Sequence, residues 1–513
     1  MKQVQIAPIE AIEEKDHVAH LDMYSVHSTS ASEKGSLASH GVEGAAFAKE
    51  RARAERRLLL KLDLGIMPFA VLLYLSAYLD RGNMANARLA GLEKSVLNNK
   101  DTNYSIALAC FFVTYITLSI PGTLMAKAVL PSRSIAAGAL VWSIAATCQA
   151  AVTNRAGLFV CRLFIGVGEA FFGQAMALHL SFWYTKRDLA KRVGFFISAG
   201  AVAGAFGGLI AFGVTSIKNA KIDNWRILFL IEGCPSLLLA IAVALFMPTR
   251  PEVSKYLNED ERTLCLTRLN AQRSQPTGID WKGVVYALTD WKVYTIAIMY
   301  SCMNLTLGSV GGFLPTIIQD GFGYSAARAQ LMTVPPYAVA LVFMLLLTTF
   351  SDWKQARGIP AACVFALGII GWAVLMSVPP KHATPAQFSA RYFACILIVT
   401  AGYTNIPIII AWTAGNSPNE SQRAASLGML NSVGQCLSVA AAFLFPKIEG
   451  PAYTKGSSVN LAFQCFGLAI ALAMTAWFRI ENRRRDRVEG PEARVEVEEE
   501  DKFDRAAGFR YTT

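Results

Sequence analysis

Apolar residues gather along this chain in long blocks that are separated by short polar breaks. A block of this length can cross the ~30 Å hydrocarbon core of a bilayer as one helix. Inside lipid the backbone must satisfy its own hydrogen bonds, so only helices and closed barrels can span a membrane. The blocks lack the period-two alternation of barrel strands, and the pattern therefore predicts spanning helices.

Twelve spans are expected, in two sets of six on either side of a long charged break. The first set is predicted over 65–84, 104–124, 135–153, 157–180, 194–216 and 227–247. The second set is predicted over 292–314, 331–350, 359–378, 391–413, 424–446 and 459–478. The sequence thus predicts an all-α polytopic membrane protein whose twelve transmembrane helices form two six-helix bundles.

The segments outside the spans complete the expected organisation. The longest internal break mixes charged residues with leucines, which predicts an amphipathic helix at the membrane surface or over the bundle. The polar, serine-rich start of the chain predicts a disordered cytoplasmic tail. The predicted units are a tail over 1–60, a bundle over 61–247, a central loop over 248–291, a second bundle over 292–478 and a cytoplasmic tail over 479–513.

Charge supports a membrane protein and argues against a nucleic-acid-binding one. Only 17% of the residues are DEKR, too few for a soluble chain of this length. The net charge is +11, but the basic residues lie mostly in the breaks and tails rather than in a folded basic domain. They cluster at 49–61, 186–192, 354–357 and 483–487, on one side of a twelve-span topology. Both termini are therefore expected in the cytoplasm, with the cell membrane, or alternatively the vacuolar membrane, as the location.

Motifs for catalysis or cofactor binding are missing from the sequence. The ten cysteines form no CxxC pair and no metal spacing, and most lie in apolar blocks, as buried free thiols do. The glycines of the fifth span follow no strand and precede no GK[ST], so they predict close helix packing rather than a phosphate loop. HExxH and GxSxG are absent too, and we expect neither an enzyme nor a bound cofactor or metal.

Ionisable side chains inside spans are costly in lipid, so each is a candidate functional residue. The first set of spans contains Asp80 and Arg81 at the outer end of span one, Arg162, Glu169 and His179 in span four, and Glu232 in span six. The interiors of the second set contain none. A side chain that couples an ion to transport by titration is therefore expected in the first set.

Span four carries the most informative pair of charges. Arg162 and Glu169 are seven residues apart, so they share one helix face, with Gly166 between them. In a functional interpretation, Arg162 attracts an anionic group and Glu169 exchanges a proton. In the alternative interpretation, the two residues form a fixed internal ion pair that orients helices.

The remaining candidates each allow two interpretations. Asp80 and Arg81 point about 100° apart and cannot pair with each other. Asp80 is expected inside the bundle, either in coupling or as a packed residue, and Arg81 either joins the site or snorkels to the outer interface. His179 is either a pH-sensitive gate residue or a hydrogen-bonded residue at an interface. The polar residues of the apolar second set either contact substrate or bond between helices; they are Asn304, Tyr403 and Asn431.

Several short stretches resemble one known family when they are taken together and in order. They are 79–87, 162–170, 225–233, 313–318, 334–337, 351–352 with 357–358, and 391–393. Over about residues 60–480, the chain resembles fungal members of the major facilitator superfamily, in the anion:cation symporter branch that includes allantoate permease-like carriers.

The resemblance implies a central cavity between two bundles, alternating access, and proton-linked uptake of small organic anions across the cell membrane. It also implies that four residues handle substrate or protons, namely Asp80, Arg81, Arg162 and Glu169. Two departures leave room for a divergent substrate. Ser119 stands where relatives carry a glutamate in span two, and the stretch 169–175 lacks their proline, so the kink expected from proline is absent.

We therefore expect a proton-coupled secondary transporter of a small organic, anionic solute, acting as a monomer in the lipid bilayer and without nucleic acid as a partner. The first alternative is an efflux carrier for a specialised metabolite in a fungal biosynthetic cluster. A non-transporting membrane sensor ranks lower, because both tails are short for a signalling domain. A sequon at Asn103 lies so close to a span that its glycosylation stays open.

Overall fold

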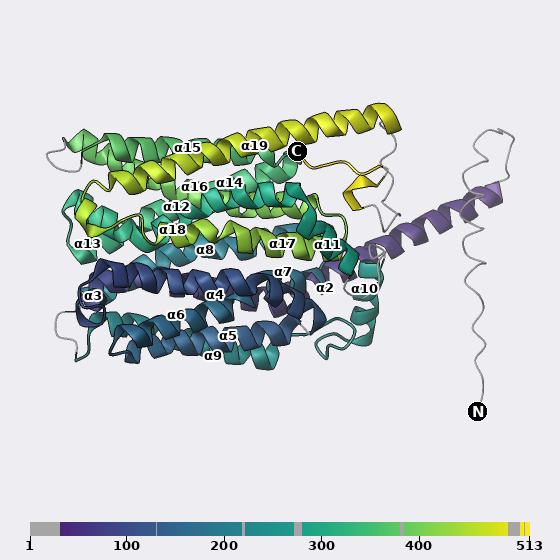
Figure 1. Cartoon of the computed structure of the whole chain (residues 1–513). Coiled ribbons are helices and arrows are strands. Elements are labelled where there is room, and N and C mark those ends of the chain that lie inside the picture. Colours follow the sequence, from purple (N-terminus) through teal and green to yellow (C-terminus); the bar gives the residue numbers. More distant parts are fainter. Residues whose placement is uncertain are drawn as a thin grey trace. The chain divides into compact units, whose positions relative to one another are not determined.

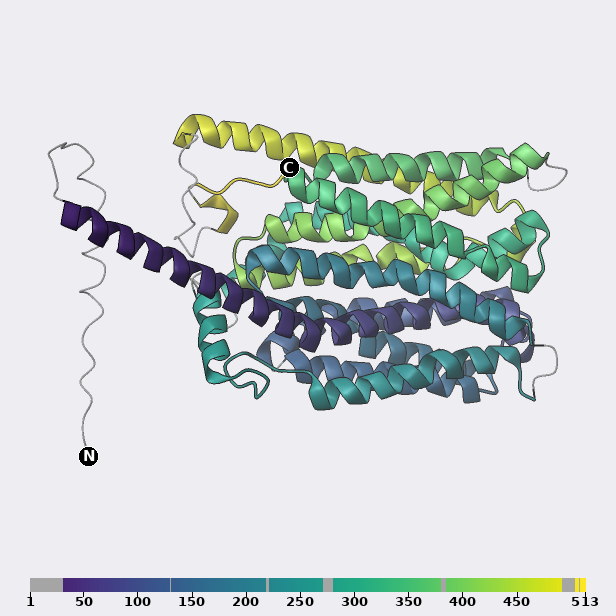
Figure 2. The ribbon, with the colours of Figure 1, turned by 180° about the vertical axis from the view of Figure 1, so that it is seen from behind.

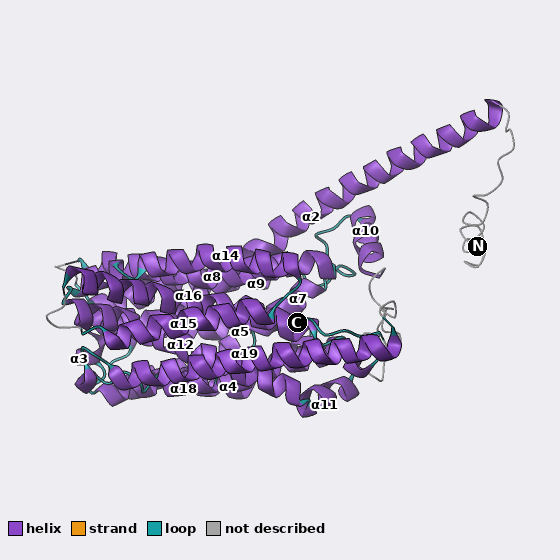
Figure 3. Cartoon of the chain, turned by 90° about the horizontal axis from the view of Figure 1, so that it is seen from above, coloured by secondary structure: helices purple, strands orange, loops and turns teal. Residues whose placement is uncertain are grey.

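The computed structural model describes residues 31–129, 131–217, 221–270, 280–379, 384–490, 503–506 and 508–513. Every regular element in these ranges is helical, which confirms the predicted all-α fold class (Figures 1 and 3). The chain divides into two units, Met1–Lys61 and Leu62–Thr513. In the first unit, the stretch 31–60 of the predicted disordered tail is helical, and residues 1–30 lie outside the described residues.

The first group of helices covers the first set of predicted spans. Its members are α2 (Ala31–Ala87), α4 (Asp101–Ala128), α5 (Pro131–Cys148), α6 (Arg155–Ala170), α7 (Gly173–Ser181), α8 (Lys186–Thr215) and α9 (Asn224–Phe246). After α2 the chain continues in a π-helical turn, Arg88–Leu92, and the short α3, Glu93–Ser95. Asp80 and Arg81 therefore lie inside a long helix and not, as predicted, at the outer end of the span.

The second group of helices covers the second set of predicted spans. Its members are α12 (Trp291–Phe322), α13 (Ala326–Leu331), α14 (Val334–Lys354), α15 (Gly358–Ser377), α16 (Pro385–Gly415), α17 (Glu420–Gly434), α18 (Cys436–Ala441) and α19 (Thr454–Glu489). In the described part of the chain, eleven helices are long and apolar enough to cross a membrane. The eleventh predicted span, 424–446, is split at Gln435 into α17 and α18.

The two groups of helices lie side by side in both side views (Figures 1 and 2). In the first group, α5 packs against α6 and α9, and α4 packs against α6. In the second group, α15 packs against α16 and α19, and α16 also contacts α12 and α14. The groups meet where α4 contacts α17 and α18, and where α8 contacts α13 and α14. These contacts must change if one group moves against the other.

The fourth predicted span is interrupted between α6 and α7, so the expectation of an unkinked span without proline is wrong. The N–H groups of Phe171 and Phe172 bond back three residues, to the carbonyls of Gly168 and Glu169, which tightens and ends the helix. Phe172 is then buried, with its ring centroid 5.1 Å from that of Trp142. Aromatic packing at the break thus takes the place of a proline.

Two short helices occupy the central segment, α10 (Glu259–Asn270) and α11 (Trp281–Thr289). An ion pair of 3.0 Å between Arg268 and Asp188 joins α10 to the first group. The start of α11 is joined to the second group, where Asn419 Nδ2 donates to Asp280 Oδ2 at 3.0 Å. We call this end of the helices the linker side and the opposite end, which contains the turn 88–101, the far side.

Longer helices bring ionisable residues into the second group, contrary to prediction. Asp320 lies in α12, and Arg391 lies in α16 with only 1% of its surface exposed. Arg391 Nη1 donates to the carbonyls of Leu375, at 3.1 Å, and Val378, at 2.5 Å. Arg391 therefore caps the end of α15, where the last carbonyls of a helix lack partners within the helix.

Candidate functional site

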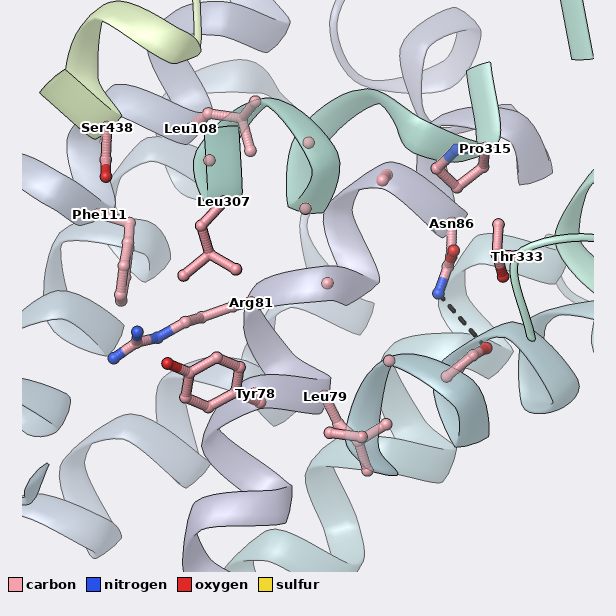
Figure 4. Close-up of a pocket in the computed structure, with 18 of the residues that line it drawn as sticks. Tyr78, Leu79, Arg81, Asn86, Leu108, Phe111, Leu307, Pro315, Thr333 and Ser438 are labelled. Atoms are coloured by element: carbon pink, nitrogen blue, oxygen red, sulfur yellow. Dashed lines mark hydrogen bonds between the residues drawn. The ribbon is translucent and has the colours of Figure 1, made fainter. Parts of the chain in front are cut away.

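A cavity with a volume of about 90 Å³ lies between the two groups of helices (Figure 4). The first group contributes lining residues from α2, α4, α6 and α8, and the second group from α12, α14, α16 and α18. Both groups therefore form the wall, as expected for a site whose accessibility changes when the groups move.

Glycines on two helices keep the cavity open. Gly207 and Gly208 on α8, and Gly308, Gly311 and Gly312 on α12, all line it. A Cβ atom on Gly311 would meet no atom within 4 Å, so the space in front of that residue is free. The glycines of the fifth span were predicted to allow close helix packing. Gly207 and Gly208 also line the cavity, where the absence of a side chain leaves space.

The best-defined polar contact at the cavity joins Arg81 on α2 to Glu169 on α6. Arg81 Nε donates to Glu169 Oε2 at 2.5 Å, and Nη2 forms an ion pair with the same oxygen. The Glu169 side chain is fully buried, whereas 20% of the Arg81 side chain is exposed. The rings of Tyr78, Phe111 and Tyr115 surround the guanidinium, with centroids 4.8 to 5.0 Å from its central carbon. Arg81 thus lines the cavity, and the alternative that it snorkels to the outer interface is wrong.

Arg162 and Asp80 form a second contact in the same region. Arg162 lines the cavity and is 1% exposed, and its Nη1 donates to the backbone carbonyl of Asp80 at 3.4 Å. In the described structure, no carboxylate lies within ion-pair distance of Arg162, and its Nε has no hydrogen-bond partner. The internal ion pair that was one interpretation of Arg162 and Glu169 therefore forms between Arg81 and Glu169 instead.

Two buried carboxyl groups in the first group of helices, those of Asp80 and Glu232, form no ion pair among the described residues. Asp80 and Glu232 are both buried, and Asp80 Oδ2 and both Glu232 carboxyl oxygens lack partners among the described residues. Glu169 is paired with Arg81, and the backbone carbonyl of Asp80 accepts from Arg162. An unpaired buried polar group is costly, so the Asp80 and Glu232 carboxyls are the groups whose burial these contacts compensate least.

His179 lies apart from these charges. It is on α7, fully buried, and absent from the cavity wall. Neither ring nitrogen has a hydrogen-bond partner among the described residues, so the predicted interface hydrogen bond is not found there. Across the described ranges, no group of three or more His, Cys, Asp or Glu side chains is placed to hold a metal ion.

The three polar candidates of the second group are in different settings. Tyr403 lines the cavity, and its ring meets that of Tyr337 edge-on at 5.5 Å. Asn304 Nδ2 donates to the carbonyl of Gly434 at 2.9 Å, which is an interhelical bond within the second group. Asn431 Nδ2 donates to the hydroxyl of Tyr115 at 3.4 Å, which joins the two groups. Only Tyr403 is part of the wall.

Sequence reasoning missed the aromatic rings around Arg81. Tyr78 precedes Arg81 by three residues, and Phe111 precedes Tyr115 by four, so each pair shares a helix face. That spacing could have placed Tyr78 beside Arg81. The approach of α4 to the same guanidinium depends on tertiary packing and leaves no signal in a single sequence.

Comparison with known proteins gives two kinds of likeness. The sequence profile of the Major Facilitator Superfamily matches residues 70–443. The chain is 33% identical over 437 residues to the MFS-type transporter efuF of Hormonema carpetanum, covering 85% of this chain and 87% of that protein. It is also 33% identical over 450 residues to the MFS-type transporter cnsO of Penicillium expansum, covering 84% and 85%.

Solved structures share the fold at low sequence identity. The partially occluded inward open xylose transporter XylE from E. coli matches with a TM-score of 0.63 and 16% identity, over 80% of this chain and 97% of that one. A bacterial homolog to the human lysosomal transporter Spinster, in an inward-facing and occupied conformation, matches with a TM-score of 0.59 and 13% identity, over 80% and 96%. At these identities the likeness concerns the fold alone.

Proposed function

The chain belongs to the Major Facilitator Superfamily, and we propose that this membrane transporter carries a small organic anion together with a proton by alternating access. The observation that carries the proposal is the presence of two largely buried guanidinium groups, Arg81 and Arg162, at a cavity walled by both helix groups. In such a low-dielectric site, a cation attracts an anion far more strongly than in water.

Arg162 is the first contact proposed for the anion. Its Nε is without a partner among the described residues, and it lines the cavity, so a carboxylate could reach it without displacing a protein carboxylate. Arg81 is the second contact, held by aromatic rings at a fixed place. Tyr337 and Tyr403 add aromatic surface from the second group for the uncharged part of the solute.

Coupling to protons follows from competition for Arg81. An anion that binds Arg81 draws the guanidinium away from Glu169, which leaves a buried carboxylate without its cation. Because such a group favours its neutral form, Glu169 then takes up a proton. The anion and the proton thus enter as a neutral pair, and the loss of one releases the other. The buried carboxyls of Asp80 and Glu232 offer further proton positions nearby.

Alternating access needs contacts on both sides that can break in turn. On the far side, Lys447 Nζ lies 2.7 Å from Glu93 Oε2, and the Lys447 amide donates to Asp101 Oδ2 at 2.6 Å. Toward the linker side, Ser432 Oγ donates to the carbonyl of Ile116 at 2.9 Å. We propose that one set opens while the other stays closed. The linker side is proposed to face the cytoplasm at the cell membrane, in keeping with its Arg192 and Arg268.

Uptake of a panel of small organic anions at two external pH values tests the proposal. The chain would be produced in cells that lack their own anion carriers, and intracellular solute would be measured by mass spectrometry. We expect accumulation of at least one anion that rises when the outside is made acidic and collapses with a protonophore. Accumulation that is independent of pH and of the protonophore would overturn proton coupling.

Efflux of a more aromatic solute is the second proposed function. It is favoured by the number of rings in the wall, since Tyr78, Phe111, Phe112, Tyr337 and Tyr403 all line the cavity. Inside-out vesicles with an acidic interior would then accumulate an aromatic metabolite in exchange for protons. If such vesicles accumulate nothing while whole cells accumulate anions, this second function is excluded.

A further inference from the structure

The end of the chain returns to the helices on the linker side of the second group (Figure 1). Phe503, Ala506, Phe509 and Tyr511 are buried there, and Asp504 is fully buried. The segment predicted as a cytoplasmic tail over 479–513 is therefore packed against helices at its described end. A peptide segment with several buried apolar side chains and a buried carboxylate is bound to its surroundings, not merely lying against them.

Asp504 is the polar anchor of this segment. Its oxygens lie 3.0 Å from Lys292 Nζ, 2.5 Å from the hydroxyl of Tyr286 and 3.0 Å from the hydroxyl of Tyr511. Burial, with the nearby Asp504 charge, raises the pKa of Tyr511, so its hydroxyl keeps the proton that it donates. Both oxygens of the buried carboxylate thus have at least one donor.

Two asparagines bind the backbone of the segment. Asn482 on α19 accepts from the Tyr511 amide at 2.9 Å and donates to the Tyr511 carbonyl at 2.8 Å. Asn416, after α16, does the same with Thr512, at 2.8 and 3.3 Å. Trp412 Nε1 also donates to the Thr512 carbonyl, at 2.8 Å. Paired contacts of this kind resemble the way a protein binds an extended peptide, by its main chain.

The same segment reaches the helix contacts between the two groups through α11. The ring of Phe503 stacks on that of Tyr286 in α11, with centroids 4.7 Å apart. α11 packs in turn against α17, where Val284 and Ala287 form a buried cluster with Ala425. Farther along, α17 contacts α4 of the first group. Contacts from one element to the next, through α11 and α17, therefore connect the end of the chain to α4.

We propose that residues 503–506 and 508–513 act as an intramolecular peptide ligand, a strap that fixes α11 and α17 on the linker side and thereby holds α4 and α17 together. Release of the strap frees α11 and favours opening between α4 and α17. The docking surface is formed by α11, α12, α16 and α19, and its occupant is this segment of the same chain.

Hydrogen exchange tests the strap without any knowledge of the solute. In the full-length chain in detergent, Asp504→Ala should raise exchange of the amides in α11 by about tenfold, because the helix loses its anchor. The exposed Asp260 on α10 supplies the matched control, Asp260→Ala, which should leave α11 unchanged. Equal exchange in α11 for the wild-type chain and Asp504→Ala would overturn the proposal, whatever the transported solute is.

A peptide added in trans supplies the second measurement. A labelled peptide of residues 503–513 should bind saturably to a chain that ends at residue 502 and much more weakly to the full-length chain. Tyr511→Ala in the peptide should weaken binding by about tenfold or more, equivalent to about 1.4 kcal/mol. Equal binding to both chains, or no binding to a truncated chain that elutes as a folded protein, would overturn the proposal.

Cross-linking gives a third measurement. Cysteines placed by Thr512→Cys and Asn416→Cys should cross-link within one chain. Cross-linking only between two chains would overturn the proposal and assign the surface to a second copy.

Discussion

Arg81 and Glu169 are bonded to each other across α2 and α6, and Glu169 has no other partner among the described residues, since its Oε1 is unbonded. The carboxylate is fully buried and the guanidinium is largely so. Each charge is therefore compensated mainly by the other. Loss of one partner and loss of both should have very different consequences.

Replacement of Arg81 alone should be far more damaging than replacement of the pair. Arg81→Gln leaves Glu169 buried without its cation and should lower the free energy of unfolding by about 3–5 kcal/mol. The double variant Arg81→Gln with Glu169→Gln should recover a large part of that loss. Unfolding in detergent micelles would measure both. A double variant no more stable than Arg81→Gln would show that the unpaired Glu169 carboxylate does not cause the loss in free energy of unfolding.

Glu169→Gln should separate accumulation from exchange. A neutral amide can neither release nor take up a proton, so uptake driven by an acidic exterior should be lost. Exchange of labelled for unlabelled solute needs no net proton movement and should remain. Glu259→Gln, at a side chain that is 84% exposed on α10, is the matched control and should accumulate solute normally. Normal accumulation by Glu169→Gln would remove Glu169 from the coupling mechanism.

The positions of the spans and the uneven distribution of charge could be predicted from the sequence. Apolar blocks mark helices because lipid allows only helices or closed barrels, and the blocks lack the alternation of barrel strands. Asp80, Arg162 and Glu169 stood out because charge in lipid is rare. The partner of Glu169 could not be predicted, because helical periodicity gives the face of one helix and not the helix that it meets. Arg162 was the only cation on that face of span four, but the cation that pairs with Glu169 is Arg81 of α2.

Two local features also escaped prediction for physical reasons. The break at Phe171 and Phe172 results from aromatic packing against α5, and a rule based on proline cannot detect it. The docking of Tyr511 depends on asparagines in α19 and after α16, which are distant in sequence. The sequence therefore predicted only a cytoplasmic tail over 479–513, and not that its apolar residues bind a surface of the same chain.

On the far side, Arg88 should matter much more for stability than Lys447. Arg88 has only 2% of its side chain exposed, pairs with Glu93 at 2.9 Å and with Asp101, and lies 4.3 Å from the ring of Tyr104. Arg88→Gln should lower the free energy of unfolding by about 1–3 kcal/mol, because Glu93 loses its buried cation and keeps only Lys447 as a counter-charge.

Lys447 makes an ion pair with the same glutamate, but half of its side chain is exposed. Lys447→Gln should therefore cost about 0–1 kcal/mol. The difference between the two substitutions is the measured quantity, by unfolding in detergent. Similar losses of unfolding free energy for both substitutions would mean that Lys447 contributes as much to stability as the buried Arg88, despite its exposure.

Arg391 should act as a structural cap. It binds the carbonyls of Leu375 and Val378 and has no carboxylate partner among the described residues, so Arg391→Leu leaves buried acceptors unsatisfied. A loss of about 1–3 kcal/mol in the free energy of unfolding is expected. A folded Arg391→Leu variant should still transport solute, and loss of transport at unchanged stability would instead place Arg391 in the transport mechanism.

Filling the cavity should stop transport without unfolding the protein. Gly311 on α12 lines the cavity, and a Cβ placed there would meet no atom within 4 Å, so Gly311→Trp can extend into open space. Gly213 on α8 is equally open but does not line the cavity, which makes Gly213→Trp the matched control. Both variants should elute as folded proteins with similar thermal midpoints, since the Cβ atom of either new side chain meets no packed atom. Uptake by Gly311→Trp should fall to the level of cells without the transporter, while Gly213→Trp keeps its rate.

The comparison of Gly311→Trp with Gly213→Trp needs only one transported solute and no assumption about protons. It therefore tests the path of the solute separately from its coupling to protons. Full uptake by a folded Gly311→Trp variant would mean that the solute passes elsewhere between the two groups of helices.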